Sequence, residues 1–348
     1  MEQKSILQFE YFSSVKQRKI DWLWYPYIPY GKLTILQGDP GEGKSTFILA
    51  IAALLTRGKA MPDGYPIGQC QNVIYQTAED NIADTVKPRL VASKADCSKI
   101  AYIIDDDATL NFDDPRIEEC LVQTNARLLI LDPLQAYLVQ DTDMYSAGRM
   151  RQQLKKVADL AAKYNCAVVI VGHMNKTSGE KNLYRGLGSI DITAIARSVL
   201  MISRDKSDSG IRYMFPIKSS LAPEGVSIAF RLDKKRGVKW LGEYTSPDIE
   251  QEKYIIDKSK QSLAERIILE MLEDEDVRST DILNKLKIMG VSARTANSAK
   301  SRLRITSYRK DGVWYWHFDE SAVPKEGNYA DSKQHKQLHS RRPSCQVS

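Results

Sequence analysis

The sequence predicts an α/β protein whose main domain is a mostly parallel sheet covered by helices on both faces. Short apolar runs alternate with helical patterns from Gly31 to about Gly242, which is typical of parallel strands buried between two helical layers. After Gly188 three more apolar segments follow one another without a helix, which predicts antiparallel strands. The alternating runs are residues 33–36, 72–76, 100–104, 128–131 and 167–171, and the later segments are 198–203, 211–217 and 226–232.

A smaller domain of three helices and a hairpin is expected near the C-terminus. Ser262 and Glu265 have the spacing of a helix-capping box, and helical patterns follow at 279–289 and 292–303. Residues 305–318 read as a β-hairpin with an Asp311-Gly312 turn. This order predicts a winged helix-turn-helix. The side chains expected in its core include Ala293, Ala296, Leu303, Trp314, Tyr315 and Trp316.

The expected domain boundaries follow changes in composition. Residues 1–30 form an N-terminal strap, because they become aromatic after Asp21 and two prolines exclude a helix. The other boundaries are 31–245 for the main domain, 246–261 for a polar linker, 262–320 for the small domain and 321–348 for a disordered tail.

Composition narrows the class of protein. The 348 residues suit about two domains, and 50 basic against 44 acidic side chains give a mild net charge of +6. The five scattered cysteines lack C-x-x-C spacing, which argues against a disulfide framework or a zinc site. No apolar run approaches the ~18 residues of a membrane span, and the first residues lack a secretory signal. We therefore expect a cytoplasmic protein with no membrane partner.

The strongest motif is Gly38-Asp39-Pro40-Gly41-Glu42-Gly43-Lys44-Ser45, which matches G-x-x-x-x-G-K-[ST]. Glycines let backbone N–H groups curl around phosphate oxygens, Lys44 can reach the β- and γ-phosphates, and Ser45 can hold Mg²⁺. The apolar strand before the motif and the helical pattern after it favour phosphate binding over an accidental glycine-rich turn. The residues expected to bind ATP are Gly38, Asp39, Pro40, Gly41, Glu42, Gly43, Lys44, Ser45 and Thr46.

Two acidic residues at strand ends complete the expected site. Asp132 follows the apolar run 128–131, as a metal-orienting Walker B aspartate does, although a turn aspartate before Pro133 is the alternative. Glu79 follows the run 72–76, where a carboxylate can activate the attacking water. The alternatives are that Glu79 is only a surface acid in a loop, or that Asp80 takes this role instead.

Together these pieces resemble the RecA-like ATPases, particularly the plasmid RepA-type hexameric helicases and their relatives on phages and mobile elements. The resemblance covers about residues 20–240 and implies a RecA-like P-loop NTPase core. It is carried by Trp22-Leu23-Trp24, Gly31-Lys32-Leu33-Thr34, the phosphate loop, Thr77-Ala78-Glu79-Asp80, Leu129-Ile130-Leu131-Asp132, Val171-Gly172-His173 and Arg185-Gly186-Leu187-Gly188-Ser189.

The same resemblance implies roles for four residues. Glu79 would be the catalytic glutamate, and His173 a sensor of the γ-phosphate, unless it is a hydrogen-bonded core histidine. Arg197 would be an arginine finger in the neighbouring subunit's site; pairing with Asp191 or Asp205 is the alternative. Lys218 resembles the trans-acting lysine of DnaB-like helicases, but Ser220 stands where many of them have an arginine.

DNA contacts are expected in two places. The polar loop 174–189 faces the DNA path in the RecA-like family, unless it is only a mobile surface loop. In the small domain, residues 282–310 hold eight basic side chains and no acidic one, which favours DNA over docking of a protein. The expected contacts are Lys176, Lys181 and Arg185 in the loop, Arg294, Asn297, Ser298, Ser301 and Arg302 on the third helix, and Arg309 and Lys310 on the wing.

The function predicted is an ATP-hydrolysing, Mg²⁺-dependent DNA motor that assembles into a homo-oligomer such as a hexameric ring. It would serve as a replicative helicase or recombination ATPase of a plasmid, phage or integrated element. The alternatives are an ATP-gated DNA-binding regulator or scaffold and a defence-system sensor ATPase, both without unwinding activity.

Overall fold

The computed structural model describes residues 9–105, 110–138, 147–173, 195–233, 237–272, 275–289 and 291–318. The chain divides into two units. The first holds the residues up to Lys260 together with 288–290, and the second holds 261–287 and the residues from Val291 onward. In the described residues no helix is both long and apolar enough to span a membrane.

A nine-stranded sheet forms the centre of the first unit in the described residues. Its strand order is β11-β10-β9-β8-β3-β7-β6-β4-β5. The parallel part consists of β3 (Leu33–Gly38), β4 (Val73–Thr77), β5 (Ile100–Ala101), β6 (Leu128–Asp132), β7 (Ala167–His173) and β8 (Ser198–Arg204). The antiparallel continuation consists of β9 (Ile211–Ser219), β10 (Ile228–Asp233) and β11 (Gly237–Glu243). The predicted fold class is confirmed, and β11 is a strand that the sequence did not indicate.

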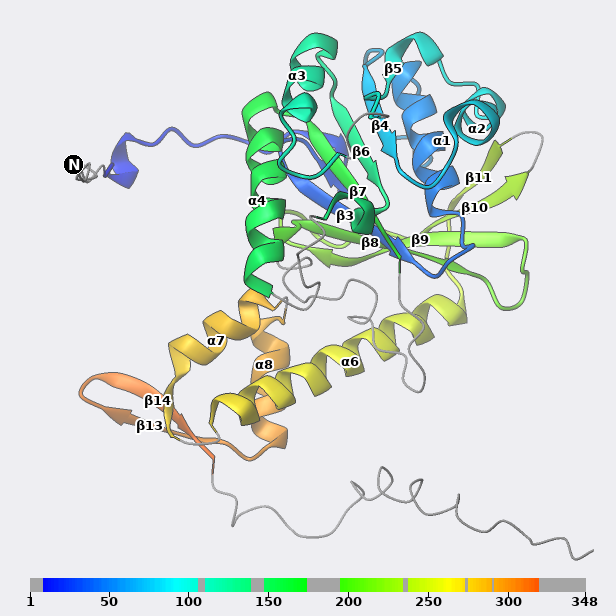
Figure 1. Ribbon diagram of the computed structural model, residues 1–348. Coiled ribbons are helices and arrows are strands. Elements are labelled where there is room, and N and C mark those ends of the chain that lie inside the picture. The colour runs from blue at the N-terminus through cyan, green and yellow to red at the C-terminus, as the bar shows by residue number, and fades with distance from the viewer. Residues whose placement is uncertain are drawn as a thin grey trace, which may run out of the picture. The chain divides into compact units, whose positions relative to one another are not determined.

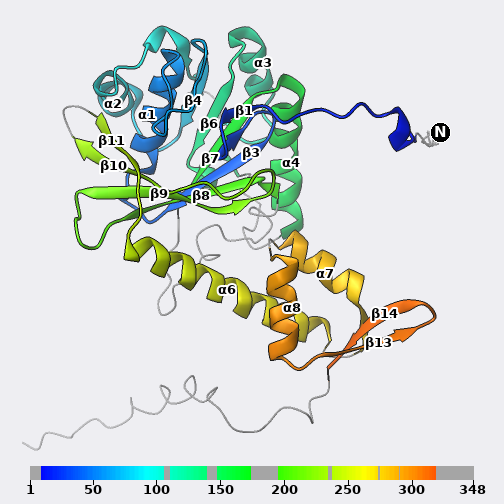
Figure 2. The ribbon, with the colours of Figure 1, turned by 180° about the vertical axis from the view of Figure 1, so that it is seen from behind.

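Helices cover both faces of this sheet, as Figures 1 and 2 show. On one face lie α1 (Lys44–Thr56) and α2 (Lys87–Ala92), and on the other lie α3 (Pro115–Thr124) and α4 (Ala147–Tyr164). Successive side chains of a strand point to opposite faces, so Ile35 packs in the core beneath α3 and α4, and Leu36 packs in the core beneath α1. Burial on both faces explains why these strands are continuous apolar runs.

The run predicted as a strand over 100–104 is shorter in the structure. Only Ile100–Ala101 pairs with β4. Beyond this pair, the backbone of Ile103 is hydrogen-bonded by the Gln76 side chain and not by a neighbouring strand. Gln76 Oε1 accepts from Ile103 N at 2.8 Å, and Gln76 Nε2 donates to Ile103 O at 3.1 Å. The sheet therefore ends earlier than the apolar pattern suggests.

The strap residues before β3 form a small hairpin, β1 (Trp22–Trp24) and β2 (Ile28–Pro29). Leu23, Trp24, Tyr27 and Ile28 are buried in the same core as Phe47 of α1. Trp24 also donates its indole N–H to Asp63 at 2.9 Å. This part of the strap is thus an integral part of the first unit.

The expected linker 246–261 is helical instead. α6 runs over Pro247–Met271 and contributes residues to both units. Its start carries the usual signals: Ser246 Oγ accepts from Ile249 N at 3.4 Å, Pro247 occupies the first helical position, and acidic residues fill the first turn. The capping-box pattern at Ser262 and Glu265 therefore lies inside a helix and does not begin one.

The second unit adds two helices and a three-stranded sheet. These are α7 (Ser279–Ile288), α8 (Ala293–Arg302), β12 (Val277–Arg278), β13 (Thr306–Lys310) and β14 (Val313–His317), with strand order β12-β14-β13. Ala296, Ala299 and Trp316 are buried, whereas Ala293 is exposed and Trp314 is 52% exposed. Ala293 and Trp314 were expected in the core. Ala293 is the first residue of α8 and is exposed. Trp314 lies on the same face of β14 as Trp316, but it is nearer the hairpin turn and stays exposed.

Candidate nucleotide-binding site

The phosphate-loop motif lies where a buried strand meets a helix, at the C-terminal edge of the parallel strands. β3 ends at Gly38 and α1 begins at Lys44. Gly43 precedes the helix with φ 89°, and a side chain there would meet Leu232 Cδ1 at 2.7 Å. A side chain at Gly38 would come within 2.5 Å of Ile202 O. Glycine is therefore required at both positions for the loop to close against β8 and β10.

The Lys44 amine holds this loop together. Its side chain is almost wholly buried, and Nζ donates to Gly38 O and Asp39 O, each at 2.9 Å. Burial lowers the pKa of this amine, and the charges of Asp132, Asp39, Glu42 and Glu79 oppose that shift. The amine is thus a desolvated cation at the mouth of the loop, where a phosphate can replace the two carbonyl oxygens.

Register brings the other expected residues to the same edge of the sheet. Thr77 on β4 lies opposite Asp132 on β6, and Ala78 N donates to Asp132 O at 3.2 Å. Gly38 on β3 lies opposite His173 on β7. The side chain of His173 is not among the described ones, so the structure gives only the place of its backbone. Ends of parallel strands are where α/β sheets bind ligands.

Asp132 is a buried carboxylate with a defined orientation. It is 3% exposed, and Tyr75 OH donates to its Oδ2 at 3.0 Å. Burial and the charge of Asp132 both raise the pKa of Tyr75, so this hydroxyl stays a donor. Tyr137, also buried, has its pKa raised chiefly by burial and further by Asp132. Sequence reasoning missed both tyrosines, whose only signal was their place in or after an apolar run.

Glu79 and Asp80, the two candidates for water activation, have different surroundings. Asp80 forms an ion pair with Arg89 of α2, with Nη1 and Oδ2 2.5 Å apart. Glu79 is exposed, its backbone N donates to Thr77 Oγ1 at 3.3 Å, and its charge acts on the Lys44 amine. Asp80 is therefore paired with α2, whereas the charge of Glu79 acts on the Lys44 amine.

The donor set fits Mg²⁺ in the presence of phosphate. Ser45, in the first turn of α1, offers a hydroxyl, and Asp132 offers a carboxylate already oriented by Tyr75. Among the described residues no group of three or more His, Cys, Asp or Glu side chains could hold a metal alone. Mg²⁺ typically takes one or two protein oxygens and completes its shell with phosphate oxygens and water.

Arg197 and Lys218 lie at the opposite edge of the sheet from the loop of their own subunit. Arg197 N donates to Leu33 O at 3.0 Å, and Lys218 pairs with Val199 at the start of β8. Leu33 opens β3 and Gly38 closes it, so this edge is about 16 Å from the phosphate loop at ~3.3 Å per residue. Neither side chain is placed to serve the site of its own chain.

Asp205, one of the two alternative partners of Arg197, follows the other end of β8. Asp205 accepts from the backbone N–H groups of Ser207 and Asp208 and from Tyr244 OH. It is therefore committed to its own turn. Asp191, the other expected partner of Arg197, lies outside the described residues.

Two arginines that the sequence did not flag do reach the loop in cis. Arg204 and Arg212 face each other across β8 and β9 at the end of the hairpin nearest Gly43. Arg204 Nε is 3.4 Å from Glu42 Oε2, and Arg212 Cδ would lie 3.6 Å from a Cβ at Gly43. Burial lowers the pKa of Arg212, and the charge of Arg204 adds to this effect. Only the antiparallel register of β8 and β9 brings these residues to the loop.

The expected DNA contacts fall into two groups. Lys176, Lys181 and Arg185 lie outside the described residues. On α8 the five expected side chains are exposed, although two of them also contact α6: Ser298 Oγ accepts from Gln261 at 3.2 Å, and Arg302 is 3.3 Å from Glu265 Oε1. Arg309 and Lys310 are exposed on β13.

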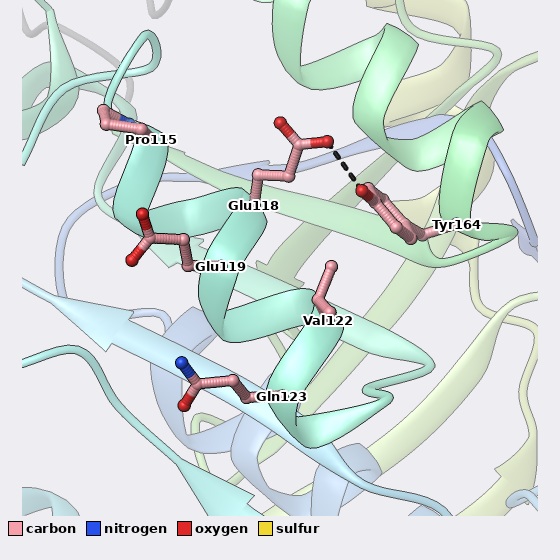
Figure 3. Close-up of a pocket in the computed structure, with 6 residues that line it drawn as sticks. All are labelled: Pro115, Glu118, Glu119, Val122, Gln123 and Tyr164. Atoms are coloured by element: carbon pink, nitrogen blue, oxygen red, sulfur yellow. Dashed lines mark hydrogen bonds between the residues drawn. The ribbon is translucent and has the colours of Figure 1, made fainter.

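A surface hollow on α3 and the end of α4 is separate from the nucleotide site (Figure 3). There Glu118 accepts from Tyr164 OH and from Lys163 Nζ, each at 2.6 Å. The hollow shares no residue with the phosphate loop. Its lining residues are Pro115, Glu118, Glu119, Val122, Gln123 and Tyr164.

The strand order and the loop define a RecA-like P-loop ATPase fold, in which β7 separates the phosphate-loop strand β3 from the Asp132 strand β6. The chain belongs to the AAA domain family, whose profile matches residues 3–179. The matched residues do not include the second unit.

Curated relatives support the same class. The DNA repair protein RadA of Halalkalibacterium halodurans is 27% identical over 150 residues, and RadA of Streptococcus pneumoniae is 28% identical over 148 residues. Each match covers 42% of this chain, and the chain spans less than a third of the relatives' own length (28% and 31%).

Solved structures with some likeness include a KaiC-like protein of Pyrococcus horikoshii and the RadB recombinase. Their TM-scores are 0.44 and 0.41, both at 17% identity. Each match covers 61% of this chain, and 90% and 91% of the respective solved chains.

We expect Lys218→Met to stabilise the protein at neutral pH, by about 1–3 kcal/mol. Burial, together with the charges of Arg197 and Lys260, lowers the pKa of Lys218 from 10.5 to about 8. Folding therefore disfavours the charged form, so the cost is present in full below pH 8 and disappears as the pH rises towards 10.5.

Urea denaturation at several pH values measures this effect, with the exposed Lys239→Met as the matched control. A stability gain for Lys218→Met that does not shrink above pH 8, or an equal gain for Lys239→Met, would contradict the assigned environment.

Proposed function

We propose that this chain is an ATP-hydrolysing, Mg²⁺-dependent RecA-like motor that acts on DNA. One observation carries the proposal: a phosphate loop closed by a buried lysine meets Asp132 and Glu79 at a single edge of a parallel sheet. Membership of the AAA domain family and the likeness to RadA support it. The absence of a spanning helix among the described residues accords with a cytoplasmic place.

Each residue of the site has a distinct task in this proposal. The backbone N–H groups of residues 38–46 bind the phosphates, and Lys44 leaves its two carbonyl partners to contact the β- and γ-phosphates. Ser45 and Asp132 would hold Mg²⁺, which would neutralise charge on the phosphate oxygens. Glu79 orients a water and accepts its proton as the water attacks the γ-phosphorus; the bond from the γ-phosphorus to the β–γ bridging oxygen breaks, and ADP and phosphate are released. His173 senses the γ-phosphate.

Transition-state charge on the γ-phosphoryl group is stabilised by cations, and in the proposed assembly a neighbouring subunit adds one to those of the cis site. Arg197 and Lys218 are cations at the far edge of the sheet, where only a neighbouring subunit's nucleotide can meet them. This placement supports an assembly of like subunits, such as a hexameric ring, with Arg197 as the finger and Lys218 beside it.

The second unit supports action on DNA. Its order of helices followed by a hairpin suits a winged helix-turn-helix, and α8 exposes Arg294, Asn297 and Ser301. Residues 282–310 contain no acid to repel phosphate. The curated relatives RadA of Halalkalibacterium halodurans and of Streptococcus pneumoniae are named as DNA repair proteins, which favours a recombination or repair role over a regulator or scaffold. Strand separation of the RepA type, in the replication of a plasmid, phage or integrated element, is the finer form of this proposal.

We expect Glu79→Gln to lower ATP turnover by about 10²–10⁴-fold while nucleotide binding persists. Asp80→Asn should lower it by less than about tenfold, because the Asp80 carboxylate is engaged by Arg89 of α2. Steady-state phosphate release with a parallel binding titration measures both. A larger loss for Asp80→Asn than for Glu79→Gln would contradict this assignment and identify Asp80 as the residue that activates the water.

We expect Arg197→Ala to retain ATP binding and to lose about 10³-fold in turnover. Mixing this variant with Lys44→Ala should restore part of the activity, since mixed assemblies contain sites with an intact loop and an intact finger. Turnover, particle size and DNA stimulation are measured for each variant and for the mixture.

Oligomers that show no recovery on mixing would contradict the trans role of Arg197. If DNA stimulates ATP turnover but no strands are separated, the proposed motor stands and the proposed helicase activity is contradicted. Slow turnover that is indifferent to single-stranded DNA, combined with sequence-specific duplex binding, would instead support an ATP-gated regulator.

A further inference from the structure

The three-stranded sheet of the second unit has two unlike faces. On one face Trp316 is buried, and Lys300 Nζ of α8 lies 4.9 Å from its ring centroid. On the other face Tyr308 lies directly opposite Tyr315, and Arg278 of β12 pairs with Tyr315 from the other side. Strand alternation thus places the two tyrosines and the arginine on the face turned away from α8. Figure 1 shows the β13–β14 hairpin extending beyond the helices of its unit.

The two tyrosine rings form an ordered pair. Their centroids are 5.7 Å apart with an interplanar angle of 18°. Tyr308 OH donates to Asp276 Oδ2 at 2.7 Å, and Tyr315 is hydrogen-bonded to Arg278. Both hydroxyls therefore have partners, while Tyr308 remains 39% exposed to solvent. Rings fixed in this way lose little conformational entropy when a ligand stacks on them.

The charges around the pair suit a polyanion. Arg278 and Lys310 are exposed on this face, and Lys310 follows Tyr308 at the next position on the same side of β13. On this face Asp276 is occupied by Tyr308 OH and by His317 Nδ1, each at 2.7 Å, and the charge of Asp281 acts on Arg278. The two exposed cations therefore remain the groups that can contact a phosphate backbone.

Aromatic faces between cations are the usual means of binding unpaired bases, because every base has a π-face and every linkage a phosphate. In a duplex the faces of the bases are covered by neighbouring base pairs, so the tyrosine rings of this sheet face cannot stack on them. Cross-strand aromatic pairs also stabilise hairpins, but that role requires neither the flanking cations nor the exposure.

We propose that the Tyr308–Tyr315 face binds single-stranded DNA, with bases stacked on the rings and Arg278 and Lys310 against the phosphates. The proposal rests on the proposed action on DNA and adds to it a second binding surface, distinct from α8. The small unit then holds an unpaired strand, whatever α8 does with a duplex.

The test uses the full-length protein without nucleotide and a fluorescent oligo(dT) of about 15 nucleotides. A strand of equal length without bases serves as the comparison. Tyr308→Leu with Tyr315→Leu removes both rings and keeps apolar bulk, and the matched control, Tyr308→Phe with Tyr315→Phe, keeps the rings and removes the hydroxyls.

We expect the double leucine variant to bind oligo(dT) about tenfold more weakly than the wild type and to bind the abasic strand equally well. The double phenylalanine variant should stay within about twofold of the wild type on both strands. An equal loss on both strands, no loss at all, or an equal loss for the phenylalanine variant would overturn the proposal.

A second measurement does not depend on the folding of any variant. Ultraviolet crosslinking of the wild type to a 5-iododeoxyuridine strand, followed by peptide mapping, should give adducts at Tyr308 or Tyr315. Adducts confined to other residues would overturn the proposal.

ATP turnover measured without DNA separates this proposal from the proposed function. Turnover without base-dependent binding refutes the stacking face alone, whereas base-dependent binding without turnover refutes the motor alone.

Discussion

The structure depends first on the closure of the phosphate loop around the Lys44 amine. A buried cation is costly unless it is hydrogen-bonded, and two carbonyl oxygens of the loop supply those bonds. The loop can fold so tightly only because glycines at positions 38 and 43 let β8 and β10 approach it. The same closure holds the amine at the place where a phosphate group can take over from the carbonyls.

The position of β3 at the centre of the sheet divides the functional residues between two edges. At its C-terminal edge lie the loop, Asp132 and the Glu79 segment, and at its N-terminal edge lie Arg197 and Lys218. A strand of six residues is rigid and cannot bring the two edges together. Under the proposed function these two groups are halves of one site, which assembly would join from neighbouring chains.

Local patterns in the sequence predicted most of the parallel sheet and the nucleotide site. The phosphate loop, Asp132 and Glu79 could be found because a strand end and a motif are short-range features. Arg204 and Arg212 could not, since only the register of β8 with β9 brings them beside Gly43. The polar start of α6 looked like a linker because, of the side chains described from Pro247 to Tyr254, only Ile249 is deeply buried, which leaves almost no apolar stripe. In the hairpin the aromatic alternation correctly predicted that Trp316 is buried, but it could not show that Trp314 is 52% exposed.

The most direct test of the account is a calorimetric titration of wild type and Lys44→Ala with a non-hydrolysable ATP analogue, with and without Mg²⁺. We expect saturable binding by the wild type that needs Mg²⁺, and binding at least about tenfold weaker for the variant, because a charge-assisted contact to phosphate is lost. A wild-type protein that binds no nucleotide with Mg²⁺ present, or a variant that binds as tightly, would contradict it.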